Sequence, residues 1–257
     1  MKTKIRRWSD LTWPELEGLK DTTIALLPTG SVEQHGPHLP TGTDLYIPMG
    51  IMDLLPTLKN AGNIAERLVM LPPVFHTYAK ESDAWTGTIN LNGHTLSLYI
   101  YDVLRRLFEQ GILNAVIFNG HMESYSFILE GIEHAVKGRE DAHVLSINWW
   151  DLISDDLIRE VFADRWPGWV AEHAALTETS LMLYLYPELV RMDKMDEGVI
   201  PEARSYKIFP QPEKVRPASG MYACADAAEK ETGRRLVQEV LEKLVPILKE
   251  EFPETRG

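Results

Sequence analysis

Short apolar runs that end in turn residues alternate along this chain with stretches of helical periodicity. The runs are rich in β-branched residues, as in buried strands, and cover 23–27, 68–75, 115–118 and 144–149. Apolar side chains recur every three or four residues, as in amphipathic helices, over 47–58, 95–110, 125–136 and 227–251. The alternation predicts an α/β fold, a three-layer α/β/α sandwich with a mostly parallel sheet.

The chain has 257 residues, enough to bury a substantial core. No shift in composition marks a boundary, so we expect one domain over residues 1–257. The proline-containing stretch 199–218 is interpreted as a long surface connection or an oligomer contact.

A formal charge of -12 argues against a nucleic-acid partner and favours a small-molecule substrate. No window approaches the roughly 18 to 20 apolar residues of a membrane span, so no membrane partner is expected. The basic segment 1–7 is followed by Trp8-Ser9-Asp10, where a signal peptide would be apolar. With Cys224 as the only cysteine, disulfides and multi-cysteine zinc sites are excluded, and we expect a cytoplasmic location.

The Gly- and Pro-rich loop 28–44 follows the first apolar run and concentrates acids and imidazoles. Glu33 and His35 are two residues apart, which in extended backbone points both side chains the same way. Asp44 lies farther along and can fold back on them. In open α/β sheets ligands bind where loops leave the carboxyl ends of strands, so this loop is a candidate site.

A second His and Glu pair, His121 and Glu123, follows the apolar run 115–118. His and carboxylate ligands suit zinc or manganese, and Asp44 has two oxygens with which to bridge two ions. Two such ions can acidify a water and polarise a carbonyl, which predicts a metal-dependent hydrolase without a side-chain nucleophile. A single pair of this kind is more often an ordinary polar loop, and spacing alone leaves that alternative open.

Both loops resemble the signature loops of the creatininase (creatinine amidohydrolase) family. The resemblance extends over about 11–252 and is carried by Gly30-Ser31-Val32-Glu33-Gln34-His35-Gly36-Pro37-His38-Leu39-Pro40, Gly42-Thr43-Asp44, Asn119-Gly120-His121 with Glu123, Thr86-Gly87-Thr88-Ile89 (Thr86 replacing the family's Pro), and Glu172-His173 ahead of Glu178-Thr179-Ser180-Leu181-Met182.

The resemblance implies two divalent metal ions, zinc or manganese, per subunit. Glu33, Asp44 and His121 would hold one ion, and His35, Asp44 and Glu123 the other. It also makes His173 a proton-transfer residue beside the substrate, with Glu172 next to it, and an imidazole that titrates near neutrality suits protonation of a leaving nitrogen. A core histidine is the alternative for His173.

Four further residues are candidates for substrate binding. The resemblance extends to Trp150 and Trp169, which flank the substrate in the family, although core or subunit-contact roles suit tryptophans equally. Family members that act on creatinine have a tyrosine where this chain has Met122, which donates no hydrogen bond. The loop 78–85, which includes Lys80, also departs from the family, so the substrate is less certain than the reaction class.

Three hypotheses follow for the function. The first is an amidohydrolase acting on C–N bonds, opening a small cyclic amide such as creatinine with a metal-bridging hydroxide. The second keeps the metal site but opens a cyclic diketone derived from inositol, with Lys80 and Glu81 contacting its hydroxyls. The third is a non-catalytic binding protein, which the intact ligand set argues against. The resemblance also implies a homohexamer, with 149–169 as part of a contact.

Overall fold

The computed structural model describes residues 4–200, 206, 208 and 217–253. A parallel sheet forms its middle layer, in the strand order β1-β3-β2-β4-β5. The strands are β1 (Arg6–Arg7), β2 (Ile24–Thr29), β3 (Leu68–Met70), β4 (Asn114–Asn119) and β5 (His143–Asn148). The central pair, β2 and β4, is in register from Ile24 opposite Asn114 to Thr29 opposite Asn119.

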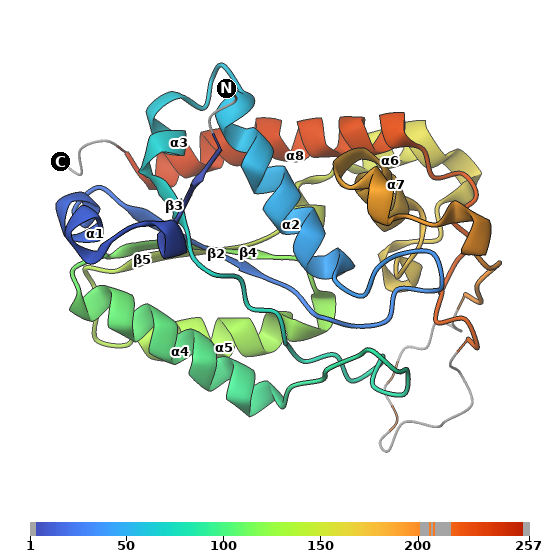
Figure 1. Cartoon of the computed structure of the whole chain (residues 1–257), viewed down its shortest axis with the longest axis horizontal. Coiled ribbons are helices and arrows are strands. Elements are labelled where there is room, and N and C mark those ends of the chain that lie inside the picture. Colours follow the sequence, from blue (N-terminus) through green and yellow to red (C-terminus); the bar gives the residue numbers. More distant parts are fainter. Residues whose placement is uncertain (1–3, 201–205, 207, 209–216, 254–257) are drawn as a thin grey trace.

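Helices cover both faces of the sheet (Figure 1). One face carries α4 (Gly93–Glu109) and α5 (Tyr125–Val136), which pack against each other. The opposite face carries α2 (Thr43–Leu54), α3 (Gly62–Arg67), α7 (Leu176–Leu185) and α8 (Lys230–Glu251), with α6 (Asp155–Phe162) near the end of α8. The short helix α1 (Trp13–Leu19) lies near the edge, between β1 and β2 in sequence.

Alternate residues of the central strands pack into two separate hydrophobic cores, one on each face of the sheet. Ile24 and Leu26 of β2 pack with α2, α7 and α8, whereas Ala25 and Leu27 pack with α4 and α5. Successive strand side chains point to opposite faces, so a strand buried on both faces must be apolar at every position. All six residues of β2 are buried, in agreement with this requirement.

The structure confirms the predicted three-layer α/β/α fold with a parallel sheet. Each apolar run contains a strand, although the run 68–75 supplies only the three residues of β3. The four predicted helices correspond to α2, α4, α5 and α8, with α5 matching at both ends. No helix among the described residues is long and apolar enough to cross a membrane.

The sequence pattern did not predict α7, because this helix is buried around much of its circumference. All of Leu176–Met182 is buried, so no polar stripe alternates with an apolar one. The stretch 199–218, expected to be a surface connection or contact, lies mostly outside the described residues.

Candidate active site

The site forms where the two central strands end side by side. Thr29 is the last residue of β2 and pairs with Asn119, the last residue of β4. The loops that follow carry Glu33 and His35 on one side and His121 on the other. The parallel register therefore brings together two segments that are about ninety residues apart in sequence, at the edge of the sheet where ligands bind in such folds.

Buried hydrogen bonds fix the turn after β4. The Asn119 side-chain amide donates to His121 O at 2.9 Å and to Asn148 Oδ1 at 2.9 Å. Its oxygen accepts from Thr29 Oγ1 at 3.0 Å and from the His121 amide at 3.1 Å. A fully satisfied buried network of this kind holds the His121 backbone in one conformation.

Two glycines let the first turn of α2 approach the strand ends. A Cβ atom on Gly30 would lie 2.4 Å from Asp44 O, and one on Gly120 would lie 1.9 Å from the same oxygen. Any larger residue at either position would displace Asp44. The glycines therefore set the depth at which the Asp44 carboxylate enters the site.

The Asp44 carboxylate lies between two imidazoles. Its Oδ1 is 3.0 Å from His35 Nε2 and its Oδ2 is 3.0 Å from His121 Nδ1. Glu33 Oε1 is 3.6 Å from the same His121 nitrogen. Asp44, His35 and Glu33 are almost completely buried, so this charge cluster is held away from solvent.

Glu33 Oε2 is buried without a hydrogen-bond partner, and the 3.0 Å contacts of His35 Nε2 and Asp44 Oδ2 lack hydrogen-bond geometry. Buried polar atoms are nearly always satisfied in native proteins, so unpartnered lone pairs that converge indicate a ligand. Imidazole nitrogens with carboxylate oxygens form a donor set that suits zinc or manganese. The residues present therefore fit a pair of divalent cations that share Asp44.

Among the described residues, three groups bring ligand atoms within 4.8 Å of one another. They are Glu33, Asp44 and His121; His35, Asp44 and Glu178; and Glu33, His35 and His173.

Glu123 was expected to be a metal ligand, but it belongs to none of these three groups. Its Oε2 lies 3.9 Å from His121 Nε2 and accepts the Glu81 amide at 3.0 Å. Glu178 instead approaches His35 Nε2, at 3.7 Å. Glu178 is thus next to His35 and Glu123 next to His121, and both carboxylates line the same cavity.

The cluster shifts the pKa of each of its members. Burial raises the pKa of Glu33 to about 7. Burial opposes charge on His121, but Glu33 and Asp44 outweigh it and raise its pKa to about 10. Burial likewise disfavours charge on His35, yet Asp44 and Glu178 raise its pKa. Burial also disfavours the charged form of Asp44, but the two histidines lower its pKa. Ligands bind metals deprotonated, so a cation must expel protons from this cluster.

His173 lies beside the cluster. Its Nδ1 is 3.5 Å from Glu33 Oε1 and its Nε2 is 3.0 Å from Gln34 O, while its ring lies 4.6 Å from the His35 ring. Burial and the charge on His35 lower the pKa of His173 to about 4, so its imidazole is neutral near pH 7. A neutral imidazole at this position is able to accept a proton and pass it on.

Glu172 has a structural role in addition to its expected one. Its Oε1 accepts the amides of Thr177 at 2.5 Å and Glu178 at 3.2 Å, which caps the N-terminus of α7. Its other oxygen, Oε2, is buried without a hydrogen-bond partner. Burial and the neighbouring Glu178 raise the pKa of Glu172 to about 8.

A cavity of about 390 Å³ opens onto the cluster. Met122, Trp150 and Trp169, the proposed substrate contacts, line it, and the Met122 side chain is 49% exposed. Trp150 and Trp169 both pack edge to face against Trp149, with ring centroids 5.5 and 6.2 Å from it. Lys80 does not line this cavity, because its exposed side chain forms an ion pair with Asp83.

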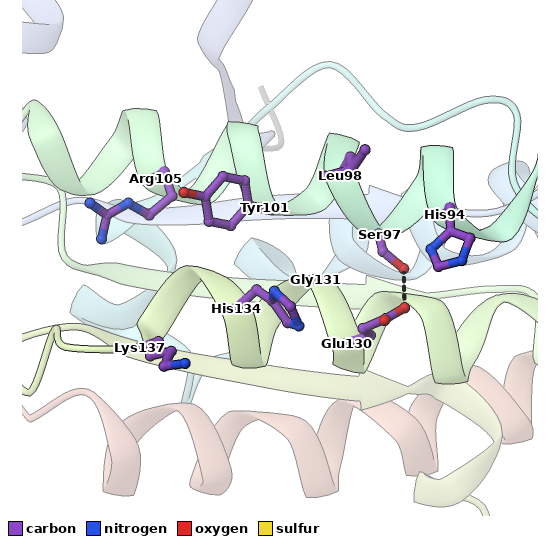
Figure 2. A pocket seen from close by; sticks show the side chains of 9 residues that line it. All are labelled: His94, Ser97, Leu98, Tyr101, Arg105, Glu130, Gly131, His134 and Lys137. Carbon is purple, nitrogen blue, oxygen red and sulfur yellow. Dashed lines mark hydrogen bonds between the residues drawn. The ribbon is translucent and has the colours of Figure 1, made fainter.

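A larger cavity, of about 570 Å³, lies between α4 and α5 on the other side of the sheet (Figure 2). In it Ser97 Oγ donates a hydrogen bond to Glu130 Oε2 at 2.8 Å. Its lining residues are His94, Ser97, Leu98, Tyr101, Arg105, Glu130, Gly131, His134 and Lys137. None of the expected site residues is among them, so the larger of these two cavities is not the one that holds the expected site residues. The smaller cavity is the candidate active site because it contains the buried ligand cluster.

Comparison with known proteins identifies the family. A family model, Creatininase: Creatinine amidohydrolase, matches residues 9–248. The chain belongs to the creatininase family. It is 30% identical to creatinine amidohydrolase from Pseudomonas putida, over 96% of this chain and 97% of that protein. It is 25% identical to 3-dehydro-scyllo-inosose hydrolase from Thermotoga maritima, over 92% and 81% of the two chains.

A crystal structure of creatininase superposes on this family member with a TM-score of 0.89 and 29% identity, covering 98% of this chain and all of that one. Creatininase structures in a manganese form and a zinc–zinc form match similarly, with TM-scores of 0.88 and 0.87. The chain is therefore a metal-dependent hydrolase of the amidohydrolase type.

Reasoning from the sequence did not single out some cavity residues as functional. Glu178 lies in α7, a helix whose sequence has no alternation of polar and apolar faces, although it falls within the stretch 178–182 that resembles the family. Tyr222 lines the cavity from a segment about fifty residues after His173 and carried no motif. Val170 also lines the cavity, and its exposed fraction is 78%. Only the fold brings these residues to the site.

Proposed function

We propose that this protein is a two-metal amidohydrolase that opens a small cyclic amide of the creatinine type. The observation that carries the proposal is the Asp44 carboxylate, with one oxygen 3.0 Å from His35 and the other 3.0 Å from His121. A buried carboxylate between two imidazoles, surrounded by unpartnered atoms, is the arrangement that a bridging ligand requires.

We assign Glu33, Asp44 and His121 to one ion. For the other ion, His35 and Asp44 would be joined by Glu178 or by Glu123, and the 3.7 Å between Glu178 Oε1 and His35 Nε2 favours Glu178. Glu123 then accepts hydrogen bonds at the cavity wall. When bound, the cations lower the pKa of a water and polarise the substrate carbonyl.

The remaining chemistry belongs to the side chains. Hydrolysis joins a water oxygen to the carbonyl carbon, breaks the C–N bond and adds a proton to the leaving nitrogen. His173 is neutral near pH 7 and lies at the edge of the cluster, so it takes the proton from the attacking water and delivers it to that nitrogen. Glu172 acts as a positioning residue through the N-terminus of α7.

The aromatic walls confine the substrate. Trp150 and Trp169 limit the cavity to a flat ring, and Met122 adds an apolar contact at the mouth. A partly apolar wall also limits the water around the polarised carbonyl, which strengthens electrostatic interactions there.

The alternative substrate, a cyclic diketone derived from inositol, is supported by the similarity to the Thermotoga maritima hydrolase. Lys80 offers this alternative little support, because its side chain pairs with Asp83 outside the cavity. Unchanged turnover of a diketo-inositol by Lys80→Ala would show that Lys80 does not contact the substrate. Loss of turnover would support a contact between Lys80 and the substrate.

We further propose that the chain acts as a single domain within a cytoplasmic homohexamer. Tryptophans are enriched at interfaces, and those of residues 149–169 support a contact that includes this stretch. Light scattering on the purified protein measures the assembly, and six times the subunit mass would agree with the hexamer. A stable monomer of the unaltered protein would refute the hexamer.

The decisive experiment loads the purified protein with manganese or zinc and measures ring opening of creatinine and of other small cyclic amides. We expect turnover with at least one cyclic amide and about two ions per chain by metal analysis. A fully loaded protein that turns over none of them would overturn the proposal. Fewer than one ion per chain after gentle purification would instead favour the non-catalytic hypothesis.

A further inference from the structure

The larger cavity, between α4 and α5, has a basic end to which no role has yet been given (Figure 2). Leu98, Tyr101 and Arg105 line it from α4, and His134 and Lys137 line it from α5 and the end of that helix. Spacings of three and four residues place each set on one face of its helix. We call this cavity the α4–α5 cavity.

The two permanent cations of the α4–α5 cavity have no ion-pair partner within the described part of the chain. Arg105 is partly buried and Lys137 is exposed, and Figure 2 shows both toward the same end of the cavity. Glu109 lies one turn beyond Arg105 but pairs with Arg106 instead, at 3.1 Å. In a chain with a formal charge of -12, this end is a local positive region that an anion can neutralise.

The acid of the cavity lies at the opposite end. Glu130 Oε2 accepts a hydrogen bond from Ser97 Oγ at 2.8 Å, and Figure 2 shows this pair away from Arg105. Seven residues separate Glu130 from Lys137, which is about 10 Å along a helix. His134 lies between them and has an N–H donor in either protonation state. The basic end is therefore not screened by the acid that shares the cavity.

Between the two ends the cavity is partly apolar. A Cβ atom on Gly131 would lie 2.6 Å from Ser97 O, so the absence of a side chain lets the two helices approach closely there. Leu98 is 62% exposed, and the Tyr101 ring is partly buried beside it on the same helix face. A ligand with an apolar body would cover this surface and remove it from water.

We propose that the α4–α5 cavity is a second ligand site, for an organic anion. Its carboxylate or phosphate group would pair with Arg105 and Lys137, and its apolar body would cover Leu98 and Tyr101. The planar fork of a guanidinium matches two oxygens of either anionic group. The volume of about 570 Å³ lies within the range of small-molecule sites, roughly 300 to 1,000 Å³. The metal cluster lies in the other cavity, so this inference does not depend on the reaction.

Calorimetry on the metal-loaded protein tests the site with 2-naphthyl phosphate and 2-naphthoate, and with 2-naphthol as the uncharged comparison. We expect Arg105→Gln to weaken binding of the preferred anion at least about tenfold, because a charge-assisted hydrogen bond is lost. Lys137→Gln should weaken it less, since that side chain is more exposed. Arg106→Gln is the matched control, because it removes the same charge from the next position of α4, outside the cavity, and should leave the Kd unchanged.

A second pair of variants tests the apolar part. Leu98→Glu places a carboxylate in the cavity and should abolish binding of the anions, whereas Tyr99→Glu, an exposed neighbour that does not line the cavity, should not. Wild type that binds neither anion overturns the proposal. Binding that survives both Arg105→Gln and Leu98→Glu also overturns it, because the anion is then held elsewhere, as at the metal cluster. Equal weakening by Arg105→Gln and Arg106→Gln would show general charge attraction in place of a site. Metal content and turnover of cyclic amides should stay as in wild type in all of these variants.

Discussion

Replacing Glu172 with glutamine tests whether its buried carboxyl group carries a proton in the folded protein. The Glu172 carboxyl caps α7 through two backbone amides, and burial together with Glu178 raises its pKa from 4.5 to about 8. Glutamine keeps an oxygen for both amides but cannot ionise. The substitution therefore removes the titration and leaves the cap in place.

The sign follows from the protons bound in each state. Between pH 4.5 and about 8 the folded protein holds a proton on Glu172 that the unfolded chain has released. Wild-type stability should therefore fall as pH rises through this window and level off above it. Glu172→Gln lacks this loss, so the difference between the two proteins isolates the Glu172 contribution, because all other titrating groups are shared.

Urea unfolding of the chelator-treated proteins at pH 5.5, 6.5, 7.5 and 9 measures this difference. A single titrating group changes stability by at most about 1.4 kcal/mol per pH unit, so Glu172→Gln should gain about 2 kcal/mol on wild type between pH 5.5 and 7.5. The exposed acid Glu188 provides the control, since Glu188→Gln should stay within about 0.5 kcal/mol of wild type at each pH. A Glu172→Gln difference that is constant across the series would refute the reasoning.

Three further changes probe the cluster directly. Gly120→Ala should lower the free energy of unfolding by roughly 2 to 4 kcal/mol and weaken metal binding, because the new Cβ would lie 1.9 Å from Asp44 O. Gly18→Ala is the control, because a Cβ there would meet no atom within 4 Å. Equal effects of the two substitutions would contradict the close approach. Asp44→Ala should reduce the metal content from about two ions to fewer than one per chain, as measured by elemental analysis, and retention of both ions would remove Asp44 as the bridge. His173→Gln should lower kcat on the order of 100-fold with little change in KM, and a change confined to KM would show that His173 binds substrate without transferring a proton.

The sequence was sufficient to predict the layers of the fold. A strand that is continuously apolar, as β2 is from Ile24 to Pro28, has to be covered on both faces, and the periodicity of α4, α5 and α8 supplies the covering helices. Helix α7 was missed because burial on most sides leaves no polar stripe to reveal its period. The periodicity of apolar residues thus predicts helices that are exposed on one side, and it misses helices that are buried on most sides.

The same division applies to the site. Glu33, His35 and His121 are visible in sequence because each lies within a few residues of the end of an apolar run, and the register of parallel strands brings such ends together. Their approach to Asp44 depends on Gly30 and Gly120, which have no Cβ atoms. The sequence contains these glycines, but it does not give their distances from Asp44.

Tertiary structure alone brought Glu178 and Tyr222 to the cavity, whereas Glu81 was already a candidate for contacting a substrate. Tyr222 and Glu81 are about 140 residues apart, and their hydrogen bond depends on the packing of loops at the cavity wall. Glu178 approaches His35 because the N-terminus of α7 is capped beside the cluster. The chain thus determines its ligand loops locally, through residue types at the ends of strands. Contacts between distant loops depend on the whole packed fold, and they decide which carboxylates reach the buried histidines and which lie at the cavity wall.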